Sequence, residues 1–220
     1  MTGSPATPPR GFRALLGETR WRALLDRGVA RVHPPGSWLL RQGDPGTTVL
    51  ALVSGRVKVL GAEPDGGQLL ITLRGPGDLL GEIAVRSAGP RTASVRAVDR
   101  CATRVLPAAA FDAFLDEHRA HGALTDYVVS KLSQAVPYQV QLVHFPPERR
   151  IARLLLEIVS LADDGSPRVP FSQREVADAL GLARSTVALH LQRLKEGGAL
   201  RPGPRLVIAD PDALKRHAGV

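Results

Sequence analysis

The chain has 220 residues, of which 44% are apolar and 4% aromatic, so one large or two modest domains can form around mainly aliphatic cores. The net charge of +8 favours a polyanionic partner without naming one. The single cysteine, Cys101, excludes a disulfide framework and a cysteine-rich metal site, and we expect it to be buried in a protein of the reducing cytoplasm. No apolar run approaches the roughly 20 residues of a membrane helix, and the N-terminus lacks the apolar core of a signal peptide, so no membrane partner is expected.

The N-terminal region is expected to form a loose tail followed by two short helices. Residues 1–10 are rich in proline, threonine and serine, which is typical of a disordered tail. Residues 11–28 carry two helical patterns, in which Trp21, Leu24 and Leu25 form an apolar stripe. We expect this stripe to pack against a neighbouring sheet.

Residues 30–106 change to short apolar runs separated by glycines. Residues 56–59 alternate as Arg-Val-Lys-Val, which indicates a half-buried strand. Short strands broken by turn residues predict a β-barrel or sandwich. The clearest strand candidates lie at 48–53, 56–60, 68–73 and 93–98.

A compact anion site is predicted within residues 77–97. Gly81 permits a tight turn, and the three residues from Glu82 onward are suited to open a short helix whose free N–H groups face a phosphate. The planar fork of Arg91 suits a phosphate, with the hydroxyl of Thr92 beside it, and Glu82 is an acceptor for a ribose hydroxyl. The simpler alternative is a Glu82–Arg91 salt bridge on a turn. The candidate ligand-binding residues here are Gly81, Glu82, Ile83, Ala84, Arg91 and Thr92.

A short helix is predicted from Pro107, and a longer one over residues 123–143. The longer helix carries an a/d-like seam formed by Val129, Leu132, Val136, Val140 and Val143. A symmetric dimer is the expected partner of this seam, and packing on the β domain is the alternative. Pro137 lies within the seam and is expected to kink or interrupt the helix.

A helix-turn-helix is predicted at residues 172–200, after a domain boundary at 145–146 marked by two prolines. An amphipathic helix from Glu148 and a short strand at 169–171 precede it. Ser172 and Glu175 form a capping box, and Gly181 separates the two helices. The second helix is expected to turn five residues outward, toward base edges or phosphates: Arg184, Ser185, Ala188, Leu189 and Gln192.

A wing is predicted to follow the second helix. Residues 201–205 form a basic turn, residues 206–209 a strand, and Asp210 caps a last short helix. Together with the two preceding helices, these elements indicate a DNA-binding unit.

In this order the motifs resemble the cyclic AMP receptor / fumarate-nitrate regulator family of bacterial transcription factors. The resemblance rests on Gly-Glu-Ile-Ala at 81–84, Pro-Arg-Thr-Ala-Ser-Val at 90–95 and the helix-turn-helix. It implies an α+β fold in three parts. These are an N-terminal cyclic-nucleotide-binding β-roll (jelly-roll-like) with flanking helices at 11–122, a long dimerisation helix at 123–145, and a C-terminal winged helix-turn-helix at 146–220.

The resemblance also implies a dimeric DNA-binding transcription regulator whose operator affinity is controlled by a cyclic nucleotide in the β-roll. Cyclic AMP is the first choice and cyclic GMP remains open because of Thr92. Glu82 would contact the ribose and Arg91 the phosphate, while Ser133 is the one suitable hydroxyl for adenine near residues 133–136. The implied partners are double-stranded operator DNA, a second copy of the chain and the effector, with RNA polymerase as a further candidate.

On the DNA side, the resemblance makes Arg184 the first base-reading arginine. Ser185 and Leu189 stand where the family has a glutamate and a second arginine, so the operator need not be the familiar half-site. The DNA-binding residues implied in this way are Ser172, Gln173, Arg184, Ser185, Thr186, Leu189 and Gln192.

Other functions are weighed against this one. A regulator of the same family with another effector, or none, is the main alternative. A haem-sensing relative stays open, although we expect the histidines, which include His33, His118, His121 and His144, to be surface or packing residues. No cofactor, metal site or catalytic residue is predicted, because no paired carboxylates, metal-ligand spacing or nucleophile constellation stands out, and the protein is therefore not expected to be an enzyme.

Overall fold

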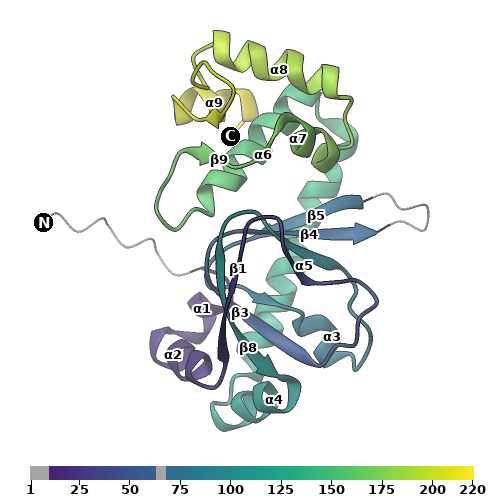
Figure 1. The fold of residues 1–220 in the computed structure, drawn as a ribbon, viewed down its shortest axis with the longest axis vertical. Coiled ribbons are helices and arrows are strands. Elements are labelled where there is room, and N and C mark those ends of the chain that lie inside the picture. The colour runs from purple at the N-terminus through teal and green to yellow at the C-terminus, as the bar shows by residue number, and fades with distance from the viewer. Residues whose placement is uncertain (1–9, 63–67) are drawn as a thin grey trace, which may run out of the picture.

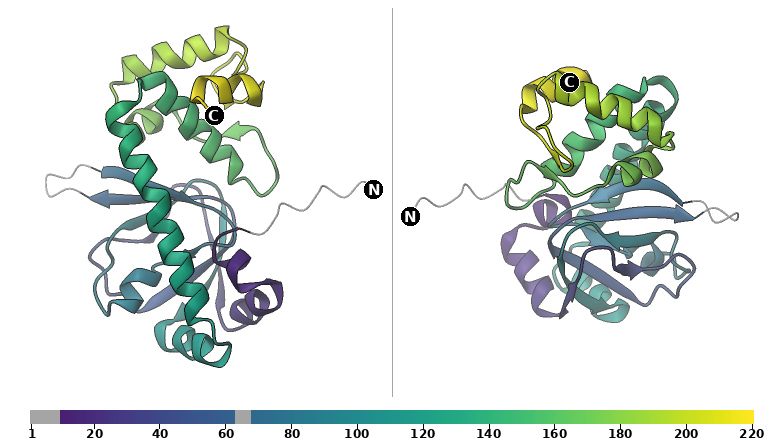
Figure 2. Two further views of the ribbon diagram at one scale, coloured as in Figure 1. Left: turned by 180° about the vertical axis from the view of Figure 1, so that it is seen from behind. Right: turned by 45° about the horizontal axis from the view of Figure 1, so that its top comes forward.

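A computed structural model describes residues 10–62 and 68–220, and of residues 62 and 135–143 it describes the backbone alone. Two parts lie one above the other in Figure 1, and the long helix α5 (His121–His144) runs along the lower part to reach the upper one, as the view from behind in Figure 2 shows. Residues 1–9 of the predicted tail lie outside the description. Arg10 is within it and donates its guanidinium to the carbonyl of Ser160.

The lower part is a roll of two four-stranded antiparallel sheets, as the alternating runs predicted. One sheet has the order β1-β8-β3-β6 and the other β2-β7-β4-β5. The strands are β1 (Val29–His33), β2 (Trp38–Leu40), β3 (Thr48–Ser54), β4 (Val57–Ala62), β5 (Gln68–Arg74), β6 (Leu79–Leu80), β7 (Ser94–Ala97) and β8 (Cys101–Pro107).

Four short helices accompany the roll, namely α1 (Gly11–Leu16), α2 (Glu18–Asp26), α3 (Glu82–Arg86) and α4 (Ala108–Glu117). Trp21 and Leu24 of the predicted stripe are buried and Leu25 packs partly against the same core. That core also takes in aromatic residues of α1, α4 and α5, so these helices close one side of the roll. Pro107 ends β8, and α4 begins one residue later than predicted, because proline fits the position before a helix as well as its first turn.

Helix α5 begins two residues before the predicted start and passes through Pro137 as helix. The expected interruption there is wrong, and the expected kink stays a prediction. Proline keeps a helical φ and removes one hydrogen bond, a loss of about 3 kcal/mol that a helix of 24 residues can absorb. Val129 and Leu132 are 56% and 68% exposed, so at these two positions the seam does not pack on the roll. The side chains of Val136, Val140 and Val143 lie outside the description.

The upper part holds the predicted helix-turn-helix and its wing. Its elements are α6 (Pro147–Ser160), β9 (Arg168–Val169), α7 (Gln173–Leu180), α8 (Arg184–Glu196), β10 (Leu206–Val207) and α9 (Pro211–Ala218). The capping box of Ser172 and Glu175 is confirmed, and Gly181 ends α7 in the left-handed region. The strand predicted at 169–171 is shorter than expected, since Pro170 has no N–H to donate to a partner strand. The domain boundary at 145–146 stays a prediction, and it coincides with the gap between α5 and α6.

The two parts share one apolar core. Leu60, Leu70 and Leu73 of β4 and β5 belong to the same buried cluster as the inner faces of α6, α7 and α8. Polar contacts cross the same boundary, including a hydrogen bond of 2.7 Å from Arg56 Nη1 to the carbonyl of Ile158. The upper part, which we call the DNA-reading part after its predicted helix-turn-helix, is therefore seated on the roll by both apolar and polar contacts.

Candidate ligand pocket and nucleic-acid interface

The predicted anion site is built on the turn between β6 and α3. Gly81 adopts φ 83° and ψ 7° and is the N-cap residue of α3, as the short-helix prediction required. A Cβ at this position would run into the guanidinium of Arg91, so glycine is needed for close approach as well as for conformation.

Arg91 lies beneath this turn and is only 4% exposed. Its Nη1 donates to the carbonyl of Gly81 over 2.8 Å, and its Nη2 donates to the carbonyl and hydroxyl of Thr48 over 2.6 and 3.1 Å. Burial lowers the pKa of this guanidinium, and the nearby carboxylate of Glu82 acts in the opposite sense. Three hydrogen bonds use three of its five N–H groups, so two remain for a ligand.

Glu82 opens α3 and is 6% exposed. Burial raises the pKa of its carboxyl, while the positive charges of Arg74 and Lys131 act to lower it. No ion pair joins Glu82 to Arg91 among the described residues, so the simpler alternative of a salt bridge on a turn is wrong. Lys131 of α5 instead pairs with Asp78, Nζ to Oδ1, over 2.7 Å.

All six residues predicted in this stretch line one hollow: Gly81, Glu82, Ile83, Ala84, Arg91 and Thr92. Ser133 is exposed on α5 and is not among the lining residues. The sequence motifs missed Arg74 of β5, which also lines the hollow and for which no local signal exists. The cavity volume is about 80 Å³, well below the roughly 300 Å³ at which small-molecule sites begin. A nucleotide would therefore require the hollow to widen.

The predicted nucleic-acid interface is the outer face of α8, at the top of Figure 1 and away from the roll. Val187, Leu191 and Leu194 are buried, as predicted for the inner face. The opposite face is exposed and carries Arg184, Ser185, Ala188, Leu189 and Gln192. Leu189 is 52% exposed.

The start of α7 carries two further predicted DNA contacts. Ser172 and Gln173 are exposed, and Ser172 receives the Glu175 N–H on its hydroxyl over 3.1 Å. The other predicted phosphate contact, Thr186, is half-buried on α8. The roles of these residues toward DNA remain predictions.

The cysteine and two of the histidines lie in the core or in a surface pair. Cys101 is fully buried, as expected, and burial raises its pKa to about 12. His33 is buried against the hydroxyl of Thr103 at 2.9 Å, and His121 pairs with Asp116 at 2.7 Å. Among the described residues, no group of three or more His, Cys, Asp or Glu side chains is placed to hold a metal ion. No helix in the described ranges is both long and apolar enough to cross a bilayer.

Comparison with known proteins gives matches in both parts. Residues 30–118 match the model of the cyclic nucleotide-binding domain, and residues 149–217 match that of the Crp-like helix-turn-helix domain. The chain is 30% identical to the cyclic AMP receptor protein of Thermus thermophilus, over 80% of this chain and 82% of that one. It is 27% identical to a CRP-like cAMP-activated global transcriptional regulator of Mycobacterium tuberculosis, over 84% and 86% of the two chains.

Solved structures show the same architecture. A CRP-family transcriptional regulator from Thermus thermophilus superposes with a TM-score of 0.73 at 25% identity, covering 86% of this chain and 97% of that one. The roll, the long helix and the winged helix-turn-helix are therefore arranged as one known fold.

Proposed function

The chain belongs to the Crp/Fnr family of transcription regulators, and from this premise we propose that it is a homodimeric regulator whose affinity for operator DNA is set by a cyclic nucleotide, cyclic AMP before cyclic GMP, bound in the roll. The observation that carries the proposal is that Glu82 and Arg91 lie on one hollow beside Gly81. We expect the protein to act in the cytoplasm, with RNA polymerase as a candidate partner.

The chemistry of the hollow matches a cyclic phosphodiester joined to a ribose. Arg91 still has two N–H groups for phosphate oxygens, and a charge-assisted pair with a phosphate is stronger than its present bonds to neutral carbonyls. Glu82 accepts from a ribose hydroxyl when ionised and donates when protonated.

A route from this site to the DNA-reading part runs through a cluster of three charged side chains, Glu82, Asp78 and Lys131. The charge of Glu82 is felt by Asp78 and Lys131, which pair with each other, and Lys131 sits on α5. A ligand that changes the position or charge of Glu82 acts on this pair and so on the helix that leads to α6. By linkage, DNA that favours the same arrangement also tightens the ligand.

Calorimetric titration of the full chain with cyclic AMP and with cyclic GMP tests the sensing half. We expect binding at micromolar cyclic AMP and a loss of about 1.5–3 kcal/mol in Arg91→Ala, since one charge-assisted contact is removed. Unchanged affinity in that variant takes Arg91 out of the site. Selection of bound duplexes from a random pool, with and without cyclic AMP, tests the DNA half and yields the operator.

A second candidate is a regulator of this family that responds to another effector or to none. It is favoured by the hollow of about 80 Å³ and by the position of Ser133 outside it. Absence of heat with both cyclic nucleotides at millimolar concentration, together with specific DNA binding, would establish this candidate over the first.

A further inference from the structure

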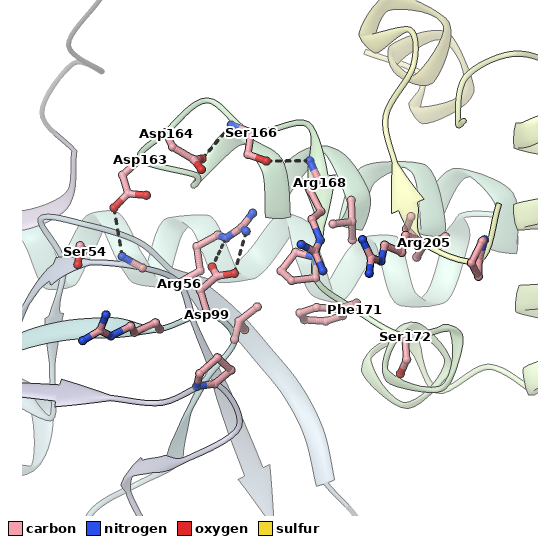
Figure 3. Close-up of a pocket in the computed structure, with 18 residues that line it drawn as sticks. Ser54, Arg56, Asp99, Asp163, Asp164, Ser166, Arg168, Phe171, Ser172 and Arg205 are labelled. Atoms are coloured by element: carbon pink, nitrogen blue, oxygen red, sulfur yellow. Dashed lines mark hydrogen bonds and ion pairs between the residues drawn. The ribbon is translucent and has the colours of Figure 1, made fainter. Parts of the chain in front are cut away.

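A cleft of about 740 Å³ lies beside the contacts between the roll and the DNA-reading part (Figure 3). The roll contributes residues of the β3–β4 turn and of the β7–β8 turn, such as Ser54, Arg56 and Asp99. The DNA-reading part contributes the turn after α6, β9 and the wing. The volume of the cleft lies within the range of small-molecule sites, whereas the volume of the hollow in the roll lies below it.

Two arginines share one face of the small β9–β10 ribbon that lines this cleft. Arg168 lies opposite Val207 in the ladder, and Arg205 directly precedes β10, two residues before Val207, so continued alternation along the chain places both side chains on one face. In the view of Figure 3 both guanidinium groups lie above Phe171. Neither guanidinium has a hydrogen-bond acceptor or an ion-pair partner among the described residues. Two unpaired guanidinium groups on one face leave their N–H donors available to an anion.

The carboxylates of the cleft do not supply that anion. Asp99 is held by Arg56 through a two-pronged pair with distances of 2.5 and 3.1 Å. Asp163 accepts from the Gly55 N–H over 3.3 Å, and Asp164 from the Ser166 N–H over 2.9 Å. In Figure 3 the last two lie toward the end of the cleft away from Arg205.

We infer that this cleft is a second ligand site, for a small phosphorylated molecule whose phosphate is held between Arg168 and Arg205. Guanidinium forks match phosphate oxygens two at a time, and two forks on one face suit a dianion or a diphosphate. Val98 and Pro35 give the opposite wall apolar surface for the rest of such a molecule. Arg100 of the roll also lines the cleft, without an acceptor among the described residues.

The site is made by both parts of the molecule, which gives its occupation a consequence. A ligand that touches both walls binds the present arrangement of roll and DNA-reading part better than any arrangement that separates them. It therefore stabilises this arrangement in proportion to its concentration. The residues that line this cleft are separate from those that line the hollow around Glu82 and Arg91.

Inorganic pyrophosphate is a suitable probe, titrated into the full chain by calorimetry and by thermal unfolding. The double variant Arg168→Gln/Arg205→Gln removes the paired forks. Arg168→Lys/Arg205→Lys keeps both charges without the fork. The matched control Arg20→Gln/Arg31→Gln removes the same charge from exposed positions of α2 and β1. Thermal unfolding without probe shows that each variant is folded.

We expect millimolar or tighter binding in the wild type and the control, at least tenfold weaker binding in the glutamine pair, and an intermediate loss in the lysine pair. No binding to the wild type, or equal losses in the glutamine pair and the control, would overturn the inference. If pyrophosphate binding survives in the glutamine pair, the probe binds elsewhere and the inference is wrong. If the pair instead lowers only the affinity and salt dependence of duplex DNA binding, the arginines serve DNA phosphates and the inference is wrong.

Discussion

The ammonium group of Lys58 on β4 lies 3.0 Å from the carboxylate of Glu175 on α7, which ties the roll to the first helix of the DNA-reading unit. The same carboxylate accepts from the N–H of Ser172 over 3.0 Å and so completes the capping box. Lys58 also lies 5.3 Å from the ring centre of Phe171. One side chain of α7 therefore serves both the helix start and the contact between the two parts.

Glu175→Gln separates these two uses, because glutamine keeps the capping box and loses the charge. In a double-mutant cycle with Lys58→Met, we expect a coupling of about 0.5–1 kcal/mol in the free energy of unfolding, small because Glu175 is partly exposed. Glu175→Ala is the control that loses cap and charge together, and should cost about 1 kcal/mol more. A coupling of zero would mean that the ion pair does not hold the two parts together.

Acid should weaken the same contact. Burial raises the pKa of Glu175, but its hydrogen bonds from Ser172 and Lys58 outweigh burial and bring the pKa below its ordinary 4.5. A lowered carboxyl pKa stabilises the fold above pH 4.5, and that stability is lost as the pH falls through the lowered value. Denaturant unfolding of wild type and Glu175→Gln between pH 7 and pH 3 should show a steeper loss in the wild type, and parallel curves would contradict this.

Glu82 should change the pH dependence of stability in the opposite direction. Its carboxyl is buried and its pKa is raised, so the folded protein binds the proton more tightly than the unfolded chain. Stability is then lost as the pH rises from about 4.5 through the raised pKa. We expect Glu82→Gln to be more stable than the wild type at neutral pH and to bind cyclic AMP about tenfold more weakly. Glu196→Gln, at the exposed end of α8, is the control, and a destabilised Glu82→Gln at pH 7 would refute the prediction.

Gly81→Ala tests the close approach of backbone and guanidinium. The added Cβ meets both a positive φ and the Arg91 side chain, so we expect a loss of about 2–3 kcal/mol in unfolding free energy. Gly181→Ala is the matched control, because Gly181 is also left-handed but has no atom within 4 Å of a new Cβ, and it should cost about 1 kcal/mol. Equal costs would show that Arg91 moves aside freely.

Leu132→Glu tests the proposed dimer. Leu132 is an exposed apolar residue on α5, and a charge there should prevent a helix seam from closing. Sedimentation velocity should show a dimeric wild type and a monomeric variant with weakened operator binding. Val29→Glu places the same charge on an exposed valine of β1 and should stay dimeric. A monomeric wild type would remove the dimer from the proposal.

Arg184→Ala tests the outer face of α8. Loss of one arginine from a base-reading helix should weaken binding to the selected operator by about 1–3 kcal/mol, and should leave nucleotide binding unchanged. The control Arg20→Ala removes an exposed arginine of α2, and its operator affinity should change by much less. Fluorescence anisotropy with operator and random duplexes measures both, and the same operator affinity in Arg184→Ala and wild type would exclude Arg184 from the interface.

The sequence by itself determined the elements whose signals lie within a few residues of one another. The capping box at Ser172, the turn at Gly81 and the spacing of Val187, Leu191 and Leu194 each act over one or two turns of chain, so their outcome could be predicted locally. The interruption of α5 at Pro137 was predicted wrongly. The free-energy cost of one proline is local, whereas the stability that offsets it comes from the whole helix.

Only the tertiary structure decided how far the hollow around Arg91 closes, and how the two parts meet. Lys58 and Glu175 are 117 positions apart, and Arg168 and Arg205 line one cleft with residues of the roll more than 60 positions earlier. Such contacts depend on the packing of whole sheets and helices against each other, and no local pattern of side chains encodes that packing.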